Sequence, residues 1–139
     1  MRKITYWALL LVMLLTPISS FVACKSTPSS LDESTVRAYT DPATETTLQG
    51  LSEGSLAKYT QHGNTQFKAA VTQETIDQVA TQIGNQFGTY VSKEYLRVEE
   101  VQGYVVVHYK VKYTKGDVGV RMVFDNDQLV AGQFFEEVQ

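Results

Sequence analysis

The sequence predicts an α+β domain in which N-terminal helices pack on a curved, four-stranded antiparallel sheet. Two observations support this: apolar residues recur with helical spacing between residues 72 and 88, and with a period of two after residue 95. Helices followed by a set of antiparallel strands are typical of the α+β class. We expect the domain to span residues 41–139, after a signal peptide at residues 1–23 and a tether at residues 24–40.

The N-terminus has the features of a secretory signal peptide. Two basic residues precede an apolar run over residues 4–15, and small residues then lead to Cys24, the one cysteine of the chain. Residues 21–24 (Phe-Val-Ala-Cys) resemble a bacterial lipobox, although Phe21 stands where leucine is usual. We therefore expect Cys24 to be lipidated and the domain to lie outside the cytoplasm, anchored to the cell membrane. An uncleaved transmembrane anchor over residues 4–23 and plain secretion remain as alternatives.

The next segment is expected to be a flexible tether. Residues 25–30, Lys-Ser-Thr-Pro-Ser-Ser, are too polar to form a core. The tether is predicted to extend to about Thr40, with Val36 and Tyr39 as the residues able to start local structure. Asp41 and Pro42 then have the residue types of a helix N-cap and first helical position. We expect that helix to run to about residue 51, with short helical turns after it.

The clearest predicted helix begins after Thr72, which can cap it, and stops at Gly88. One face of it carries an apolar stripe, formed by Ile76, Val79, Ala80, Ile83 and Phe87. Strands are predicted over residues 95–101, 105–113, 118–124 and 129–135, because apolar and polar residues alternate there. Turns are expected at residues 102–103, 114–117 and 125–127, which are rich in Gly, Asp, Asn and Lys.

This order of elements resembles the family called domain of unknown function 3887 (DUF3887). The likeness covers residues 41–136 and includes the segment 48–54 (Leu-Gln-Gly-Leu-Ser-Glu-Gly), the helix end at residues 86–88, the valine-rich hairpins and the strand at residues 129–132. The resemblance implies a cone-shaped fold of the nuclear-transport-factor-like (NTF2-like) or cystatin-like kind. It also implies an extracytoplasmic domain without an agreed activity. Cone folds often form homodimers and can hold a pocket between helices and sheet.

The composition excludes several classes of function. Lys and Arg number 12 against 15 Asp and Glu, and no basic cluster occurs, so we expect no nucleic acid partner. A single cysteine excludes an internal disulfide framework and a cysteine-rich metal site. Asp125-Asn126-Asp127 has oxygen ligands but lacks the glycine and distal glutamate of a calcium loop, so a hairpin turn is the better interpretation. We expect no metal and no cofactor.

Four tyrosines are the candidate ligand-pocket residues: Tyr90, Tyr95, Tyr109 and Tyr113. Their ordinary role would be packing, with the ring inside and the hydroxyl at the edge. His108 shares a strand face with Lys110 and Lys112, so it is expected to be a surface histidine. His62 is expected to be a polar loop residue. The pairs Glu99-Glu100 and Glu136-Glu137 are adjacent on strands, so the two carboxylates of each pair should point to opposite faces.

These residues predict a non-enzymatic binding or interaction module of the cell envelope. Its expected partners are the membrane, through the lipid on Cys24, and a small apolar ligand, a second copy or another envelope protein. The alternative function is a small isomerase, dehydratase or hydrolase-associated enzyme that uses the cone cavity, and it requires an acid or base directed inward. A cystatin-like inhibitor is a third alternative, but no exposed hydrophobic wedge is visible in the sequence.

Overall fold

The computed structural model describes residues 31–138. Its elements are α1 (Glu33–Glu53), α2 (Leu56–Tyr59), α3 (Thr65–Ala70), α4 (Gln73–Phe87), β1 (Tyr90–Val101), β2 (Tyr104–Tyr113), β3 (Gly116–Phe124) and β4 (Val130–Glu136). The strands form one antiparallel sheet in the order β1-β2-β3-β4. The predicted α+β class, with helices first and a four-stranded meander after, is confirmed.

The predicted signal peptide, Cys24 and the tether up to residue 30 lie outside the described residues. Within residues 31–138, no helix combines the length and the apolar character that crossing a membrane requires.

Helix α1 corrects the predicted start of the domain. It begins at Glu33, capped by the Asp32 side chain, which accepts a hydrogen bond from Ser34 N (3.2 Å). Pro42, predicted at the first helical position, instead lies inside the helix. Residues 33–40 are therefore helix and not tether. The reason is burial: Val36 is 4% exposed and Thr40 is fully buried, so packing outweighs the helix-breaking tendency of the proline.

Helix α4 has the predicted ends. Thr72 caps it by accepting a hydrogen bond from Thr75 N (3.2 Å), and Gly88 follows it with a φ of 87°, a conformation that favours glycine. The strands also agree with prediction, except that β1 begins at Tyr90 and not at Tyr95. The turn at residues 102–103 has positive φ at both positions (52° and 82°), as a two-residue hairpin turn requires.

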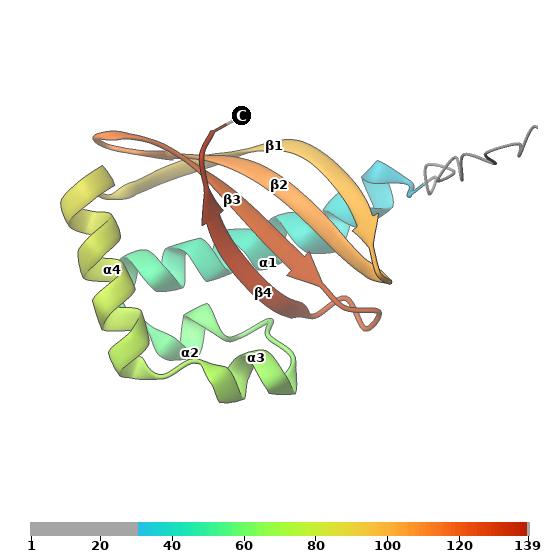
Figure 1. Ribbon diagram of the computed structural model, residues 1–139, viewed down its shortest axis with the longest axis horizontal. Helices are drawn as coiled ribbons and strands as arrows, with labels where there is room; N and C mark the ends of the chain where they lie inside the picture. The colour runs from blue at the N-terminus through green and yellow to red at the C-terminus, as the bar shows by residue number, and fades with distance from the viewer. Residues whose placement is uncertain (1–30, 139) are drawn as a thin grey trace, which may run out of the picture.

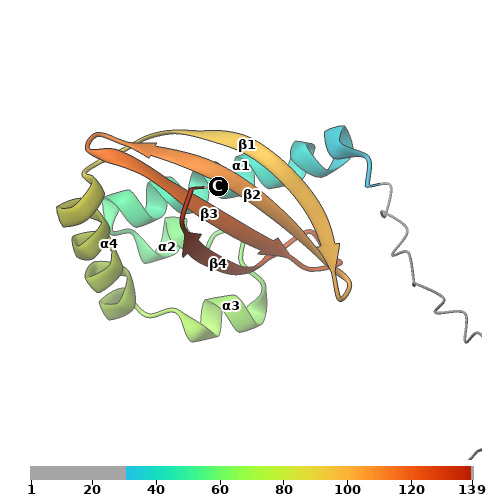
Figure 2. The same ribbon diagram turned by 45° about the horizontal axis from the view of Figure 1, so that its top comes forward.

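The helices cover one face of the sheet and one of its ends (Figures 1 and 2). Helix α1 runs behind the strands, α4 stands near the β2–β3 turn, and α2 and α3 lie near β4. Fully buried side chains from α1 and from the helix-facing side of the sheet form the core, among them Leu48, Val107, Tyr109, Met122 and Phe124. The opposite side of the sheet, here called the outer face, carries no helix.

Candidate functional site

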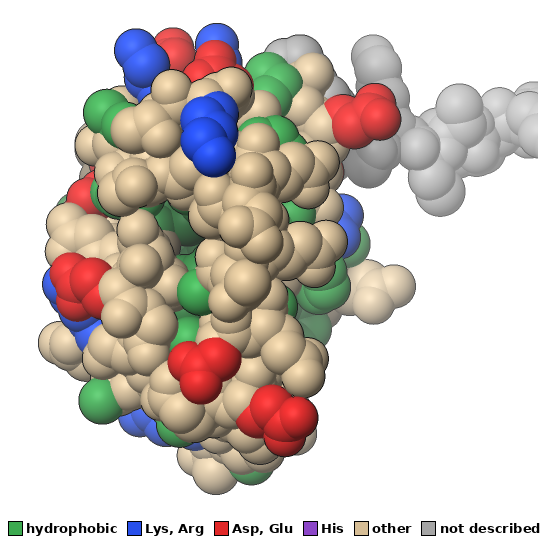
Figure 3. Space-filling model, turned by 90° about the vertical axis from the view of Figure 1, so that its left-hand side faces the viewer, with side chains coloured by type: hydrophobic (Ala, Val, Ile, Leu, Met, Phe, Trp, Pro, Cys, Tyr) green, Lys and Arg blue, Asp and Glu red, His purple; other side chains and the backbone are tan. Residues whose placement is uncertain are grey.

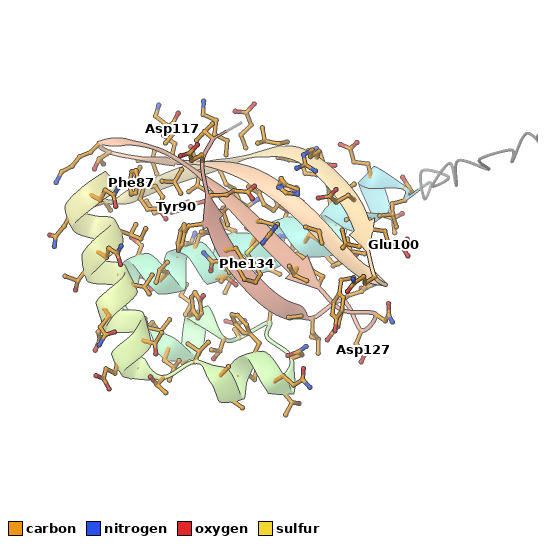
Figure 4. The ribbon with its side chains drawn as sticks, in the orientation of Figure 1. Phe87, Tyr90, Glu100, Asp117, Asp127 and Phe134 are labelled. Atoms are coloured by element: carbon orange, nitrogen blue, oxygen red, sulfur yellow. The ribbon has the colours of Figure 1, made fainter. Side chains whose placement is uncertain are left out.

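A groove of about 740 Å³ lies between α4 and the adjoining ends of β3 and β4. We call it the α4–β4 groove. Val79, Ile83 and Phe87 line it from α4, and Phe135 lines it from β4. Phe87 and Asp117, at the start of β3, lie at the same end of the molecule (Figure 4) and both border the groove.

The groove exists because the apolar stripe of α4 is only partly covered. Val79, Ile83 and Phe87 follow one another at intervals of four residues and therefore share one face of the helix. Ile83 is buried against the core, whereas Val79 and Phe87 are half-buried. The uncovered part of the stripe remains as the helical wall of the groove.

The strand wall is also apolar. Phe135 pairs with Val120, a fully buried residue, and so lies on the helix-facing side of β4. Its side chain is nevertheless 37% exposed, because no helix packs directly on it. Val118, buried to 5% exposure, completes the floor from β3.

The polar border of the groove consists of amides and carboxylates. Gln82 and Gln86 lie one turn apart on α4, and Asp117, Glu136 and Glu137 lie on the sheet side. Asp117 Oδ2 is 3.0 Å from Lys110 Nζ. None of the described residues that line the groove is a lysine, arginine or histidine. The site is suited to an apolar ligand without negative charge.

The surface around α4 is also poor in charge. Figure 3 views the side on which α4 lies and shows mainly uncharged polar groups and backbone, with few lysine, arginine or acidic side chains. Hydrophobic side chains form the bottom of a hollow on this side. A ligand that approaches α4 meets amides and apolar groups more often than charges.

The four candidate tyrosines lie together on the helix-facing side of β1 and β2. They form two edge-to-face pairs, Tyr90 with Tyr113 (ring centroids 6.1 Å apart) and Tyr95 with Tyr109 (6.1 Å). Tyr109 and Tyr113 are buried in the core, and Tyr113 lines a small cavity of about 270 Å³ beside the end of α1. Their role as ligand-pocket residues remains a prediction.

Two of these tyrosines bind acidic residues of α1. Tyr90 Oη donates to Glu45 Oε2 (2.7 Å), and Tyr109 Oη donates to Asp41 Oδ1 (2.9 Å). Burial raises the pKa of both hydroxyls well above the usual value of 10.0, and burial alone raises the pKa of Tyr113 to about 12. The hydroxyls therefore remain neutral donors at physiological pH.

Asp41 is the most heavily paired acid on α1. Arg37 Nε lies 3.1 Å from its Oδ2, and Lys93 Nζ lies 3.4 Å from its Oδ1. Burial would raise the pKa of Asp41, but the Tyr109 hydrogen bond and the two cations lower it below 3.8. Asp41 is thus a fixed anion that positions Tyr109.

His108 is not the surface histidine that the strand pattern predicted. It is on the outer face, yet only 4% exposed. Its Nδ1 lies 2.7 Å from Glu136 Oε1 and its Nε2 lies 2.8 Å from Glu99 Oε1. The hydrogen bond from His108 lowers the pKa of Glu99 below its usual 4.5. Both ring nitrogens face carboxylates, so both must carry a hydrogen to make the two bonds.

The covering of His108 depends on a close approach of the chain after β4. A Cβ atom added to Gly119 would lie 2.8 Å from the Glu137 carbonyl oxygen, so the glycine lets this segment lie directly on β3. A pocket of about 270 Å³ beside the histidine is lined by Leu96, Glu136 and Glu137, among others. The lysines that share the strand face with His108 lie beyond this cover.

The remaining sequence candidates have ordinary structural roles. The His62 side chain is half-buried in a loop whose backbone carbonyl accepts a hydrogen bond from Val130 N (2.8 Å). Asp125 holds its hairpin turn: its Oδ1 accepts from Asp127 N and Leu129 N, each at 3.0 Å. Across residues 31–138, no cluster of three or more His, Cys, Asp or Glu residues is arranged to hold a metal ion.

Sequence reasoning found the α4 stripe but not the groove that it lines. Phe135, Gln82 and Gln86 were not among the predicted site residues. The signal available for them was the double phenylalanine at residues 134–135 at the end of the last strand, which a fully covered edge would not require.

Comparison with known proteins places the chain in a family. The search of the solved structures gave an NTF-2-like protein of unknown function from Burkholderia xenovorans, with 10% sequence identity and a TM-score of 0.40, covering 74% of this chain and 87% of that chain. No curated protein matches the sequence. The model of the family described as Protein of unknown function (DUF3887) matches residues 44–132, which run from α1 into β4. The chain therefore belongs to the DUF3887 family.

Proposed function

We propose that this protein is a membrane-anchored lipoprotein of the cell envelope whose domain binds an apolar ligand in the α4–β4 groove. The observation that carries the proposal is the groove itself, which combines apolar walls from Val79, Phe87 and Phe135 with a volume of about 740 Å³. Ligand sites in proteins are mostly concave, apolar and of this size, with a few polar groups at the border.

We favour binding over catalysis because the border lacks an available acid–base pair. Asp117 is paired with Lys110, and Glu136 is paired with His108. The amides of Gln82 and Gln86 can orient a ligand, but they do not transfer protons at neutral pH. The small-enzyme alternative therefore gains no support from this groove.

The groove proposal can be tested with an adjacent pair of phenylalanines. Phe135 lines the groove, whereas Phe134 pairs with Arg121 on the outer face and is 48% exposed. We expect Phe135→Gln to weaken binding of an uncharged fluorescent apolar probe by about tenfold, because about 1.5–3 kcal/mol of apolar burial is lost. Phe134→Gln is the matched control and should bind normally. Equal affinities of wild type and both variants would contradict the proposal.

The anchor is tested separately through Cys24. If lipidation holds the protein at the membrane, Cys24→Ser should release it into the soluble fraction and abolish incorporation of a labelled fatty acid. A Cys24→Ser protein that stays in the membrane fraction would instead indicate an uncleaved N-terminal helix.

A further inference from the structure

One wall of the α4–β4 groove is the free edge of the sheet. Strand β4 is the terminal strand and pairs with β3 alone. A loop covers only its first residue: Val130 N donates to the His62 carbonyl (2.8 Å), and Asn64 N donates to the Val130 carbonyl (2.9 Å). From residue 131 to residue 136, every second residue directs its backbone N–H and C=O away from β3.

This edge lacks most of the features that normally prevent pairing. Proteins protect an edge strand with lysine, proline, a bulge or a covering segment. Residues 130–136 contain neither lysine nor proline, and the one irregularity in the pairing with β3 lies at the start of the strand, before Gly132. Phe134, Phe135 and Val138 are 48%, 37% and 40% exposed. The unprotected length is residues 132–136.

Gln133 gives an independent indication of a hydrogen-bonding ligand. Its side-chain Nε2 and Oε1 are both buried, and neither has a hydrogen-bond partner among the described residues. Gln133 pairs with the core residue Met122, so it faces the helices on the same side of β4 as Phe135. A buried amide without partners is costly, and a peptide group supplies the donor and the acceptor that it needs.

The charges at the groove select among peptides. Asp117, Glu136 and Glu137 border it, and no basic residue does among the described lining residues. Gln82 and Gln86 face the ligand from the helix side. A segment with acidic side chains would therefore be repelled, whereas apolar residues flanked by lysine or arginine would be complementary.

We propose that the α4–β4 groove binds an extended peptide segment, which adds as a fifth strand to the edge of β4 at residues 132–136. Backbone hydrogen bonds to β4 provide affinity, and alternate side chains enter the apolar space between Phe135 and the α4 stripe. The partner is a neutral or basic, apolar segment of another envelope polypeptide. This inference rests on the proposed binding function and names the ligand class.

The test uses the full-length protein in detergent and a capped probe peptide of alternating valine and threonine with lysine at each end. The matched control peptide has the same side chains but carries N-methyl groups on alternate residues, so that it cannot pair with a strand edge. We expect the control to bind at least about tenfold more weakly, because several hydrogen bonds are lost. We also expect the probe peptide to slow hydrogen exchange of backbone amides within residues 132–136.

Two variants separate this inference from the proposed function. Gln133→Leu should weaken the probe peptide severalfold without lowering the stability of the free protein, because it removes an unpaired amide. Phe135→Gln should weaken both the peptide and the apolar probe. If the apolar probe depends on Phe135 but the two peptides bind equally, or neither peptide binds, the peptide inference is overturned while the groove function stands. If neither apolar probe nor peptide binds, both are overturned.

Discussion

His108 links three strands on the outer face of the sheet. It extends from β2, Glu99 from β1 and Glu136 from β4, and the two carboxylates hold its two ring nitrogens at 2.8 and 2.7 Å. Arg97 Nη1 lies 3.0 Å from the same Glu99 oxygen as the histidine does. The end of β4, and with it one side of the α4–β4 groove, is thereby fastened to the middle of the sheet.

Replacing His108 should therefore destabilise the protein. We expect His108→Ala to lower the free energy of unfolding by about 2 kcal/mol, because Glu136 loses its partner in a largely buried site. His62→Ala, in a half-buried loop, should change it by less than about 0.5 kcal/mol. Urea unfolding of both variants measures the difference. Similar values for the two would show that the His108 contacts contribute little.

At the scale of elements, the approach of α2 to α1 depends on a glycine. A Cβ atom added to Gly50 would lie 2.3 Å from Tyr59 N, so the backbones of the two helices are in direct contact. This contact places Tyr59 against Phe67, with ring centroids 5.5 Å apart, and so positions α3. Gly84, in the interior of α4, has no atom within 4 Å of its added Cβ.

The two glycines should respond oppositely to the same substitution. Gly50→Ala forces α2 away from α1, and we expect a loss of about 1–3 kcal/mol, as for other overpacked sites. Gly84→Ala adds a better helix former in open space and should gain up to about 1 kcal/mol. Thermal unfolding of both variants tests this pair. A stabilising Gly50→Ala would refute the direct contact of the two backbones.

At the scale of the whole molecule, burial of tyrosine hydroxyls sets an alkaline limit to stability. Burial raises the pKa of Tyr59 and of Tyr113 from 10.0 to about 12, and it raises the pKa of Tyr90 and Tyr109 as well. A tyrosine with a raised folded-state pKa binds its proton more tightly in the native state than in the unfolded one. Its contribution to stability is therefore complete below pH 10 and declines as the pH rises toward 12.

We accordingly expect the free energy of unfolding to fall between pH 10 and about 12, together with a cooperative increase in tyrosinate absorbance. Tyr104 is 42% exposed, so Tyr104→Phe should leave this decline unchanged, whereas Tyr113→Phe should reduce it. Stability that stays constant up to pH 12 would contradict the assignment. Denaturant titrations at a series of alkaline pH values measure it.

The elements that sequence predicted correctly are those with local causes. The α4 stripe between Thr72 and Gly88, the alternating strands and the turn residues all act within a few positions along the chain. The start of α1 was mispredicted because Asp41-Pro42 has the local features of a helix start. Whether the helix extends further toward the N-terminus depends on the burial of Val36 and Thr40 in a core formed by distant strands.

The face of each β1 residue was likewise decided by tertiary pairing. A register shift between Tyr95 and Arg97 breaks the simple alternation, so Tyr95 pairs with the core residue Tyr109 while Arg97 pairs with His108 on the outer face. One inserted residue exchanges the two faces of a strand. The sequence pattern alone therefore could not bring Glu99 to His108.

The sequence by itself determined the fold class, the long helix, the strand order and the family resemblance, because hydrophobic period and turn chemistry are local properties. It also carries the prediction of a lipid anchor at Cys24. Only the tertiary structure decided that α4 leaves part of its apolar stripe uncovered and that the edge of β4 faces it, which creates the α4–β4 groove. Those features depend on how far one element stands from another, and no local pattern encodes that distance.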